Sequence, residues 1–499
     1  MNGPEVLDDR TGKGPDFEHV SPMRRILHLC FPTAGAVVVF LLTVVFAPIV
    51  LVSVHIHQSP QFSPIDEINH YDYVTRVAAG SIPRIGDQIQ PASIQMLECH
   101  GIAVPSVSMP PCGTPLGPQV KAALADELPQ FEAQQPPGYY ALTVPMRWAA
   151  IHLFAMSDPT ATRMSGIIWL LLGLTMLWAA CRIVRLPPLR IGAGILLVAT
   201  APLVIYTGSN VTNDAASIFA GSLVLLVGAL AWTRPGRWRA PVLALVAFGV
   251  VLCKAVDVLP VIALAILFAL ESVSIWRRQD SVDVDLVPGS GEPEALGRAG
   301  LGAAIMRWLP TGGALLAGGV LSVAAWAAVS HARAYIDPAT IATWHVLRTA
   351  PNGITDIMRE SVSMLTPLTG SFDPFRSSSH ALIDEPVRMQ NLAYVLSAAL
   401  VYALAAGAAG GFFVTTRRWY HWMGLVSIPV LYLGGVALGY AIHWSYNVDP
   451  SVSGRYGLAM APLLIVALVA SVRGRWVVGL LWCLGAAAFA FSLAAMLIR

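Results

Sequence analysis

Charged residues are scarce in this chain, and their scarcity excludes an ordinary soluble protein. Only 12% of its residues are charged and 56% are hydrophobic, whereas a soluble domain has about 25% charged residues. Several apolar runs of about twenty residues are long enough to cross a bilayer as helices. The sequence therefore predicts an all-α polytopic membrane protein, because lipid-exposed backbone must satisfy its own hydrogen bonds.

The signatures of common cofactor sites are missing too. The chain has no Walker motif, GxGxxG fingerprint, HExxH pair, haem signature or internal repeat. No second His, Cys or carboxylate stands at convincing metal spacing from His70, so we expect no cofactor and no dedicated metal site, although a divalent metal is compatible with the sequence. The net charge of +2 gives no sign of a nucleic-acid partner.

Cysteine is used sparingly, in two kinds of place. Four of the six cysteines lie in or beside apolar segments: Cys30, Cys181, Cys253 and Cys483. The other two, Cys99 and Cys112, lie together in a polar loop and form no metal motif. We predict that they form a disulfide if this loop faces an oxidising space, and that the bond serves as a loop staple.

The apolar runs predict about eleven spans, within a range of roughly 10 to 13. We expect them near residues 31–54, 163–182, 190–208, 214–232, 240–254, 257–275, 309–330, 391–414, 422–443, 455–472 and 476–497. They divide the chain into a disordered cytoplasmic tail (1–22), an N-terminal transmembrane module (23–275) with a long outer loop (55–160), a disordered cytoplasmic linker (276–308), and a C-terminal module (309–499) with a second outer loop (331–390).

Arginine clusters predict the orientation. Arg24 and Arg25 precede the first span, which places the N-terminus in the cytoplasm. The later clusters are Arg182/Arg185/Arg190, Arg234/Arg237/Arg239, Arg277/Arg278, Arg417/Arg418 and Arg473/Arg475. All of them face the cytoplasm if residues 139–156, which contain Pro145 and Arg147, lie in the membrane interface. If residues 139–156 crossed the membrane, most of the clusters would face outward.

Residues 63–80 (SPIDEINHYDYVTRVAAG) predict a short amphipathic helix at the outer membrane surface, and this helix carries candidate catalytic residues. Ser63 is expected to cap it, Pro64 suits its first position, and Gly80 suits its end. One face recurs at helical spacing and would rest on lipid or protein: Ile65, Ile68, Tyr71, Val74 and Ala78. Another face carries Asp66, His70 and Tyr73, with Glu67 beside them. We expect the carboxylate pair of Asp66 and Glu67 to hold the chemistry at the boundary of water and lipid.

Ionisable residues at the edges of spans are costly, so they are candidates for function. On the predicted topology they gather on the outer side: Asp66, Glu67, Asp214, Lys254, Asp257, Asp449 and Arg455. Structural roles remain open for several of them. Asp66 also suits a helix N-terminus, Lys254 and Asp257 a buried ion pair, and Arg455 an interfacial anchor. His70 also suits a hydrogen-bonded surface position, and Gln135 and Tyr139 a rigid turn before an interfacial helix.

Three stretches give the chain a resemblance to a known superfamily: IDEINHYDYV followed by AAGSIP, EAQQPPGYYAL, and VSGRYGLAMAPL. The layout resembles that of the GT-C membrane glycosyltransferases, which use polyprenyl-phosphate sugars as donors. Within that superfamily the chain looks most like a bacterial family of large membrane proteins. GSNVTNDAASI and CKAVDVLPVIAL match more weakly, and the second outer loop has no matching motif.

The resemblance implies a role for each candidate residue. Asp66 takes the place of the general base that acts on the acceptor hydroxyl, and Glu67 is its alternative. Arg455 and Lys254 are implied to contact the donor phosphate, and Asp214 takes the place of a second outer acidic residue that some members have. The remaining candidates for substrate binding are His70, Gln135 and Tyr139. No nucleotide-binding loop is needed, because the leaving group is a lipid phosphate.

Together these observations predict a GT-C-like glycosyltransferase of the bacterial plasma membrane. Its active site would face the extracytoplasmic side, and its partners would be the bilayer, a polyprenyl-phosphate sugar and a glycan or lipid acceptor. The alternatives are a transporter or lipid flippase of envelope precursors, and a non-catalytic scaffold for envelope assembly. The sequence identifies neither the donor sugar nor the acceptor.

Overall fold

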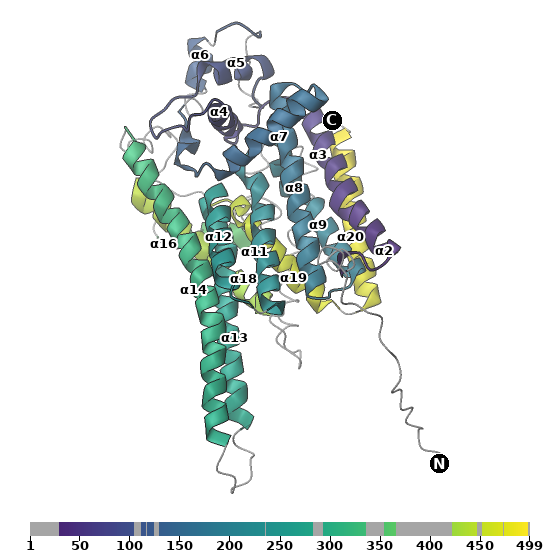
Figure 1. The fold of residues 1–499 in the computed structure, drawn as a ribbon. Coiled ribbons are helices and arrows are strands. Elements are labelled where there is room, and N and C mark those ends of the chain that lie inside the picture. Colours follow the sequence, from purple (N-terminus) through teal and green to yellow (C-terminus); the bar gives the residue numbers. More distant parts are fainter. Residues whose placement is uncertain are drawn as a thin grey trace.

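The described residues form a helical bundle with a smaller helical cap over one end (Figure 1). The computed structural model describes residues 29–103, 111–115, 117–123, 129–234, 236–282, 293–335, 354–365, 422–446, 452–472 and 474–497. Among these residues there are no strands, only two isolated bridges. The prediction of an all-α polytopic architecture is confirmed at this level.

Eight helical segments of the described chain are long and apolar enough to span a membrane. They are α2–η2–α3 (Ala34–Gln58), α8 (Asp158–Ile183), η4–α11 (Asn213–Thr233), η5 with the start of α13 (Ala255–Val273), most of α14 (Trp308–Arg333), most of α18 (Trp422–Ile442), η10–α19 (Gly454–Ser471) and α20 (Arg475–Leu497). Each overlaps a predicted span. A further helix, α12 (Arg239–Cys253), is apolar but shorter.

One predicted span is broken in the structure, and another lies outside the described residues. The expected span 190–208 is broken into α9 (Pro188–Ala199) and α10 (Pro202–Ser209), which meet at an angle of 64°. Pro202 explains the break, because it lacks the amide hydrogen that a continuous helix would use there. The predicted span 391–414 lies outside the described residues, as do the tail 1–22 and Asp449.

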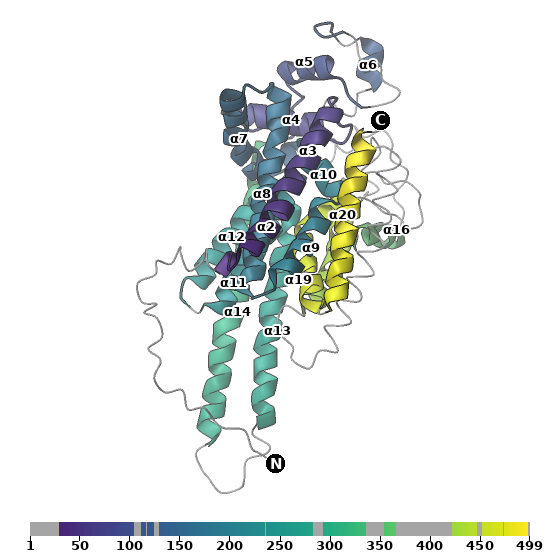
Figure 2. The same cartoon turned by 90° about the vertical axis from the view of Figure 1, so that its right-hand side faces the viewer.

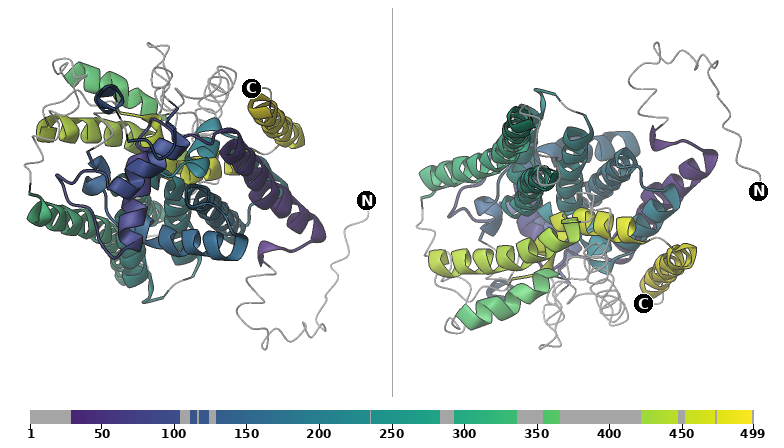
Figure 3. Two further views of the ribbon diagram at one scale, coloured as in Figure 1. Left: turned by 90° about the horizontal axis from the view of Figure 1, so that it is seen from above. Right: turned by 90° about the horizontal axis from the view of Figure 1, so that it is seen from below.

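Helices α11 and α19 form the centre of the bundle, whereas α14 and α20 lie at opposite edges of it (Figure 3). The apolar windows of the spans that contain α11 and α19 are 72% and 83% buried, against 22% for α20. Gly221 of α11 lets the chain approach closely at this centre, since a Cβ there would lie 1.8 Å from the Ala459 carbonyl oxygen of η10 (Gly454–Met460). This contact places η10 directly beside α11 near the capped end.

Helices α13 (Val258–Val282) and α14 (Pro293–Arg333) project together from the end of the bundle opposite the cap (Figures 1 and 2). The predicted disordered linker 276–308 is therefore too long, because helix extends into it from both sides. Its acidic, glycine-rich composition masked these helical extensions. The part that lies outside the described residues is 283–292.

The cap follows the first span and consists of α4 (Glu67–Ala78), α5 (Pro91–His100), α6 (Pro118–Ala123), η3 (Phe131–Gln134) and α7 (Gly138–Phe154). The helix predicted over 63–80 thus begins later than expected. Ser63 is not its N-cap: its hydroxyl contacts the Tyr206 hydroxyl, while Asp66 occupies the N-cap position without a side-chain capping bond.

Helix α4 also differs from the prediction in its burial. It packs against α5, η3 and α7, and nine of its twelve residues are buried. Of the two expected surroundings, lipid or protein, the structure gives protein, so α4 is an internal element of the cap. Its polar residues are buried because they have partners, as described below, and this pairing overrides the amphipathic pattern.

Helix α7 corresponds to the segment expected in the membrane interface. It is not among the helices that pass as candidate spans in the described chain. Two aromatic residues of α7, Trp148 and Phe154, are 57% and 68% exposed. Exposed aromatic residues on a helix beside a bundle suit the boundary between water and lipid.

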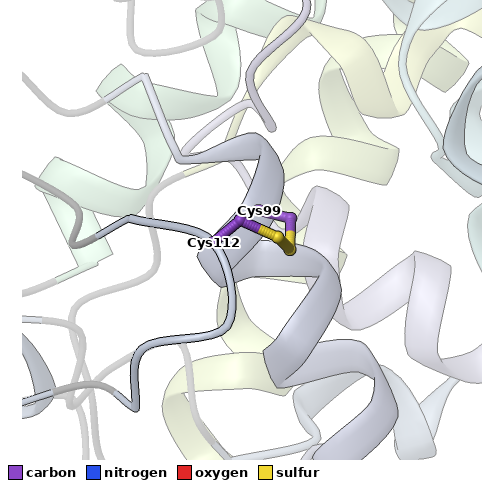
Figure 4. The surroundings of a disulfide bond; sticks show 2 residues. All are labelled: Cys99 and Cys112. Atoms are coloured by element: carbon purple, nitrogen blue, oxygen red, sulfur yellow. A yellow bond between two sulfur atoms is a disulfide. The ribbon is translucent and has the colours of Figure 1, made fainter.

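The cap contains the predicted disulfide. Cys99, near the end of α5, is bonded to Cys112, and the two sulfurs are the labelled pair in Figure 4. The four cysteines outside the cap are free. The bond closes the chain over a separation of 13 residues and so restrains the outer part of the cap.

We expect denatured, unreduced protein from membranes to react with four maleimides, and reduced protein with six, because four cysteines are free and the chain has six. Intact-mass spectrometry measures this directly. Replacing both Cys99 and Cys112 with serine should lower the free energy of unfolding of the cap by about 3 kcal/mol, the value for a loop of this size. Six maleimides before reduction would contradict the disulfide.

A charged cluster at the capped end as candidate active site

A buried ion pair attaches α4 to the bundle. The two carboxylate oxygens of Glu67 accept four hydrogen bonds, two from Arg163 of α8 (2.7 Å each) and one each from the amides of Ser63 (2.7 Å) and Val211 (2.9 Å). Four bonds fill the acceptor capacity of a carboxylate. Glu67 therefore acts as an anchor for the start of α4, and its geometry does not favour the alternative role as a base.

A second carboxylate, Asp72, organises the other side of α4. It is fully buried and accepts hydrogen bonds from Arg76 (2.7 Å), Gln130 (2.7 Å), Ser93 (2.8 Å) and the Gln90 amide (2.9 Å). These donors come from α4, from α5 and its N-terminal end, and from the segment before η3. The cap therefore closes around α4, which is held from both sides by satisfied carboxylates.

Four of the predicted residues meet where α4, η4, α12 and η10 approach one another. Arg455 lies 3.0 Å from an Asp66 oxygen and 3.8 Å from an Asp214 oxygen, and Lys254 forms an ion pair with Asp214. The aromatic ring of Tyr456 lies beside both cations, 4.9 Å from the Lys254 nitrogen and 5.4 Å from the Arg455 guanidinium carbon. The structure thus brings these four predicted residues together at the capped end of the bundle.

The proposed pairing of Lys254 with Asp257 is wrong in detail. Asp257 instead accepts a hydrogen bond from the Ser217 hydroxyl (2.9 Å), and Lys254 pairs with Asp214. Lys254 has an extended backbone (φ −159°, ψ 128°) between α12 and η5. Because this break interrupts the helical register, the spacing of Lys254 and Asp257 along the chain does not decide which residues pair.

Asp66 is the most accessible carboxylate of this cluster. Its side chain is 34% exposed, against 2% for Asp214. Its backbone is left-handed (φ 59°, ψ 3°), a conformation that Asp and Asn tolerate better than most residues. Asp66 is thus outside the helical register, which allows its carboxylate to face Arg455 while the carboxylate of Glu67, the next residue, enters the bundle.

A buried group of three polar residues lies beside the charged cluster. His70 Nδ1 is 2.8 Å from the Tyr140 hydroxyl, and Tyr140 donates to a Glu132 oxygen at 3.4 Å. The same Glu132 oxygen is 3.6 Å from His70 Nδ1. Burial lowers the pKa of His70 to about 3, so His70 is neutral at physiological pH. The structure thus corrects the surface position that was one interpretation of His70.

Glu132 was not among the residues singled out from the sequence. It lies in η3, at the start of the EAQQPPGYYAL segment, and its side chain is only 12% exposed. In the sequence, Glu132 stands eight positions before Tyr140, and this spacing is the only local feature that points to it. In the structure, the ring of Tyr140 stacks on the ring of Tyr73 in α4, with the ring centroids 3.6 Å apart. This stacking brings η3 and its carboxyl group to the charged cluster.

Gln135 and Tyr139 have supporting positions. The backbone carbonyl of Gln135 accepts a hydrogen bond from the Tyr73 hydroxyl (3.1 Å), and the buried ring of Tyr139 packs against Trp169 at 5.9 Å. Both contacts hold α7 and η3 against α4 and α8. The geometry therefore favours the structural interpretation of these two residues over direct substrate binding.

The arrangement suits acid–base chemistry on an anionic substrate. Arg455 presents planar, forked donors that match a phosphate, and Lys254 adds a second cation. Asp66 supplies a partly exposed carboxylate in contact with the same arginine. Within the described part of the chain, no group of three or more His, Cys, Asp or Glu residues is arranged to hold a metal ion.

We expect Glu67→Gln to lower the free energy of unfolding by about 3–5 kcal/mol, because it leaves the Arg163 charge buried and unpaired. Asp66→Asn is the matched control. Its side chain is 34% exposed, so it should cost only about 0–1 kcal/mol. Thermal unfolding of both variants in the same detergent measures the difference. Equal losses would contradict the assignment of Glu67 as the anchor.

Comparisons with known proteins leave the site to be interpreted from its own geometry. No protein-family profile, no curated protein and no solved structure matches the chain. The function must therefore be inferred from the residues of the charged cluster, from the chemistry that they can carry out and from the sequence motifs.

Proposed function

We propose that the protein is a membrane glycosyltransferase that transfers a sugar from a polyprenyl-phosphate donor to an envelope acceptor. The observation that carries this proposal is the contact at 3.0 Å between Asp66, which is partly exposed, and Arg455, which adjoins the buried Asp214–Lys254 pair. One accessible carboxylate and two cations at the end of an apolar bundle are what glycosyl transfer from a lipid phosphate requires. The sequence resemblance to the GT-C superfamily supports the same reaction.

The reaction assigns a role to each charge. The acceptor hydroxyl oxygen bonds to the anomeric carbon of the sugar while the bond from that carbon to the phosphate oxygen breaks. The electron pair of the broken bond stays on the phosphate, and the hydroxyl proton moves to Asp66. Arg455 and Lys254 stabilise the charge that develops on the phosphate. Asp214 holds Lys254 in place through their buried ion pair.

We place the capped end on the extracytoplasmic face of a bacterial plasma membrane and the N-terminus in the cytoplasm. Arginines of the predicted cytoplasmic clusters lie at helix ends away from the cap, such as Arg182 in the last turn of α8 and Arg475 at the start of α20. The Cys99–Cys112 disulfide in the cap suits an oxidising compartment. The lipid tail of the donor would lie among the spans, and the sugar would meet its acceptor at the cap.

A transporter or lipid flippase is the second candidate, and one observation favours it. The bent pair α9–α10, with its 64° angle, resembles the discontinuous helices that form transport sites. Such sites lie near the membrane midplane, however, whereas the charged cluster here lies beneath the cap at the end of the bundle. Sugar transfer by purified protein separates this candidate, and the non-catalytic scaffold, from the enzyme.

We expect Asp66→Asn to reduce sugar transfer by about 100-fold or more, because it removes the base but keeps the size and backbone preference of the residue. Membranes that contain the protein would be supplied with labelled polyprenyl-phosphate mannose and arabinofuranose, and the labelled product would be counted. The control is the thermal stability of the variant, which should match that of the wild type. Transfer that survives the substitution would contradict Asp66 as the base, and absence of transfer by folded wild-type protein would contradict the enzyme.

A further inference from the structure

We propose that Glu132 is a further functional residue of this site, and that its charge controls binding of the phosphate-bearing donor. This role rests on the proposed glycosyl transfer, since the donor phosphate is the anion that would meet that charge. Glu132 is separate from the residues already assigned to the reaction; it contacts His70 and Tyr140, and the charges of the cluster act on its carboxyl group. It is a positioning residue, because it acts on the substrate through the charge of the cluster.

The position of Glu132 is fixed by bonds on both sides of it. The Gln130 side chain accepts a hydrogen bond from the Glu132 amide (3.1 Å), and the Glu132 carbonyl accepts one from the Gln135 amide (2.8 Å). Trp326 of α14 donates to the Gln134 carbonyl at 2.7 Å. Helix α14 and the cap together hold η3 against α4, so the carboxyl group cannot move away from the cluster without breaking these contacts.

The charges around Glu132 are balanced when Glu132 itself is neutral. Four of them act on its carboxyl group: Asp66, Asp214, Lys254 and Arg455. Two are negative and two are positive, so the cluster has no net charge. A phosphodiester donor brings one negative charge, which such a cluster tolerates. An ionised Glu132 would make the cluster negative before the donor arrives, and the two anions would repel each other in a partly buried site.

Burial, with a contribution from the nearby Asp66 carboxylate, raises the pKa of Glu132 to about 8. Glu132 is therefore mostly protonated and neutral at pH 7, and it becomes negative as the pH rises through about 8. The residues that contact Glu132 or its partner Tyr140, namely His70, Tyr140 and Tyr73, do not change charge over this range. Burial lowers the pKa of His70 to about 3 and raises the pKa of Tyr140 and Tyr73 above the ordinary tyrosine value. Glu132 is thus the member of this group that changes charge just above neutral pH.

The experiment measures binding of a polyprenyl methyl phosphodiester to the full chain in nanodiscs between about pH 7 and pH 9. This probe carries one negative charge throughout that range, so a change in its affinity reports on the protein. We expect the Kd of the wild type to rise roughly tenfold as Glu132 ionises. Glu132→Gln should bind with the affinity of the wild type at pH 7 and keep it at higher pH.

Two further variants make the measurement specific. Tyr140→Phe removes the hydroxyl that donates to Glu132 at 3.4 Å. Loss of that donor disfavours the ionised form, so the midpoint of the Kd change should move to higher pH. Glu98→Gln is the matched control, because Glu98 lies in the cap on α5 but is not among the charges that act on Glu132. It should retain the pH dependence of the wild type.

The outcomes separate this proposal from the proposed function. A pH dependence that disappears in Glu132→Gln and shifts in Tyr140→Phe supports it. A wild-type Kd that does not change with pH, or a change that persists in Glu132→Gln, overturns the role of Glu132 but leaves glycosyl transfer standing wherever labelled sugar is still transferred. Folded wild-type protein that neither binds the probe nor transfers sugar overturns both.

Discussion

A buried charge is tolerated only where a partner and hydrogen bonds replace the water that it loses. The Glu67–Arg163 pair meets that condition, and the rest of the site depends on it. Arg163 also donates to the backbone carbonyls of Ser59 and Gln61 (2.6 Å each), and Glu67 accepts from the Val211 amide. One ion pair thus joins the end of the first span, the start of α4, the start of α8 and the segment that leads to Asp214. This junction fixes where α4 begins, and Asp66 occupies the N-cap position of that helix.

Adjacent carboxylates have different surroundings in this protein. Glu67 is 1% exposed and has every acceptor position filled, whereas Asp66 is partly open and shares Arg455 with a buried partner. The left-handed backbone at Asp66 makes this division possible, because two successive residues within a regular helix would point only about 100° apart. The anchor Glu67 therefore directly follows the candidate base Asp66, so the buried bonds of Glu67 help to fix the position of the Asp66 carboxylate.

The sequence predicts the spans well because a bilayer imposes a length and a composition on each of them. The predicted span 163–182, for example, lies within α8 (Asp158–Ile183). The break in 190–208 was missed because apolar residues flank Pro202 on both sides. Asp66, Asp214, Lys254 and Arg455 were found because charge at a span edge is conspicuous. Arg163 and Glu132 were missed because their roles are set by partners far along the chain, which no local pattern reveals.

The order in which the ribosome makes the chain determines when the long-range contacts of the site can form. The chain needs 96 more residues after Glu67 before Arg163 exists, and 389 more after Asp66 before Arg455 exists. At ribosomal rates of about 5–20 residues per second, these intervals last roughly 5–19 s and 20–78 s. The α4 anchor can therefore form early, while most of the membrane domain is still unmade. The charged cluster around Arg455 is completed only when the last spans are inserted, so a truncated or half-inserted chain has the anchor but lacks the candidate site.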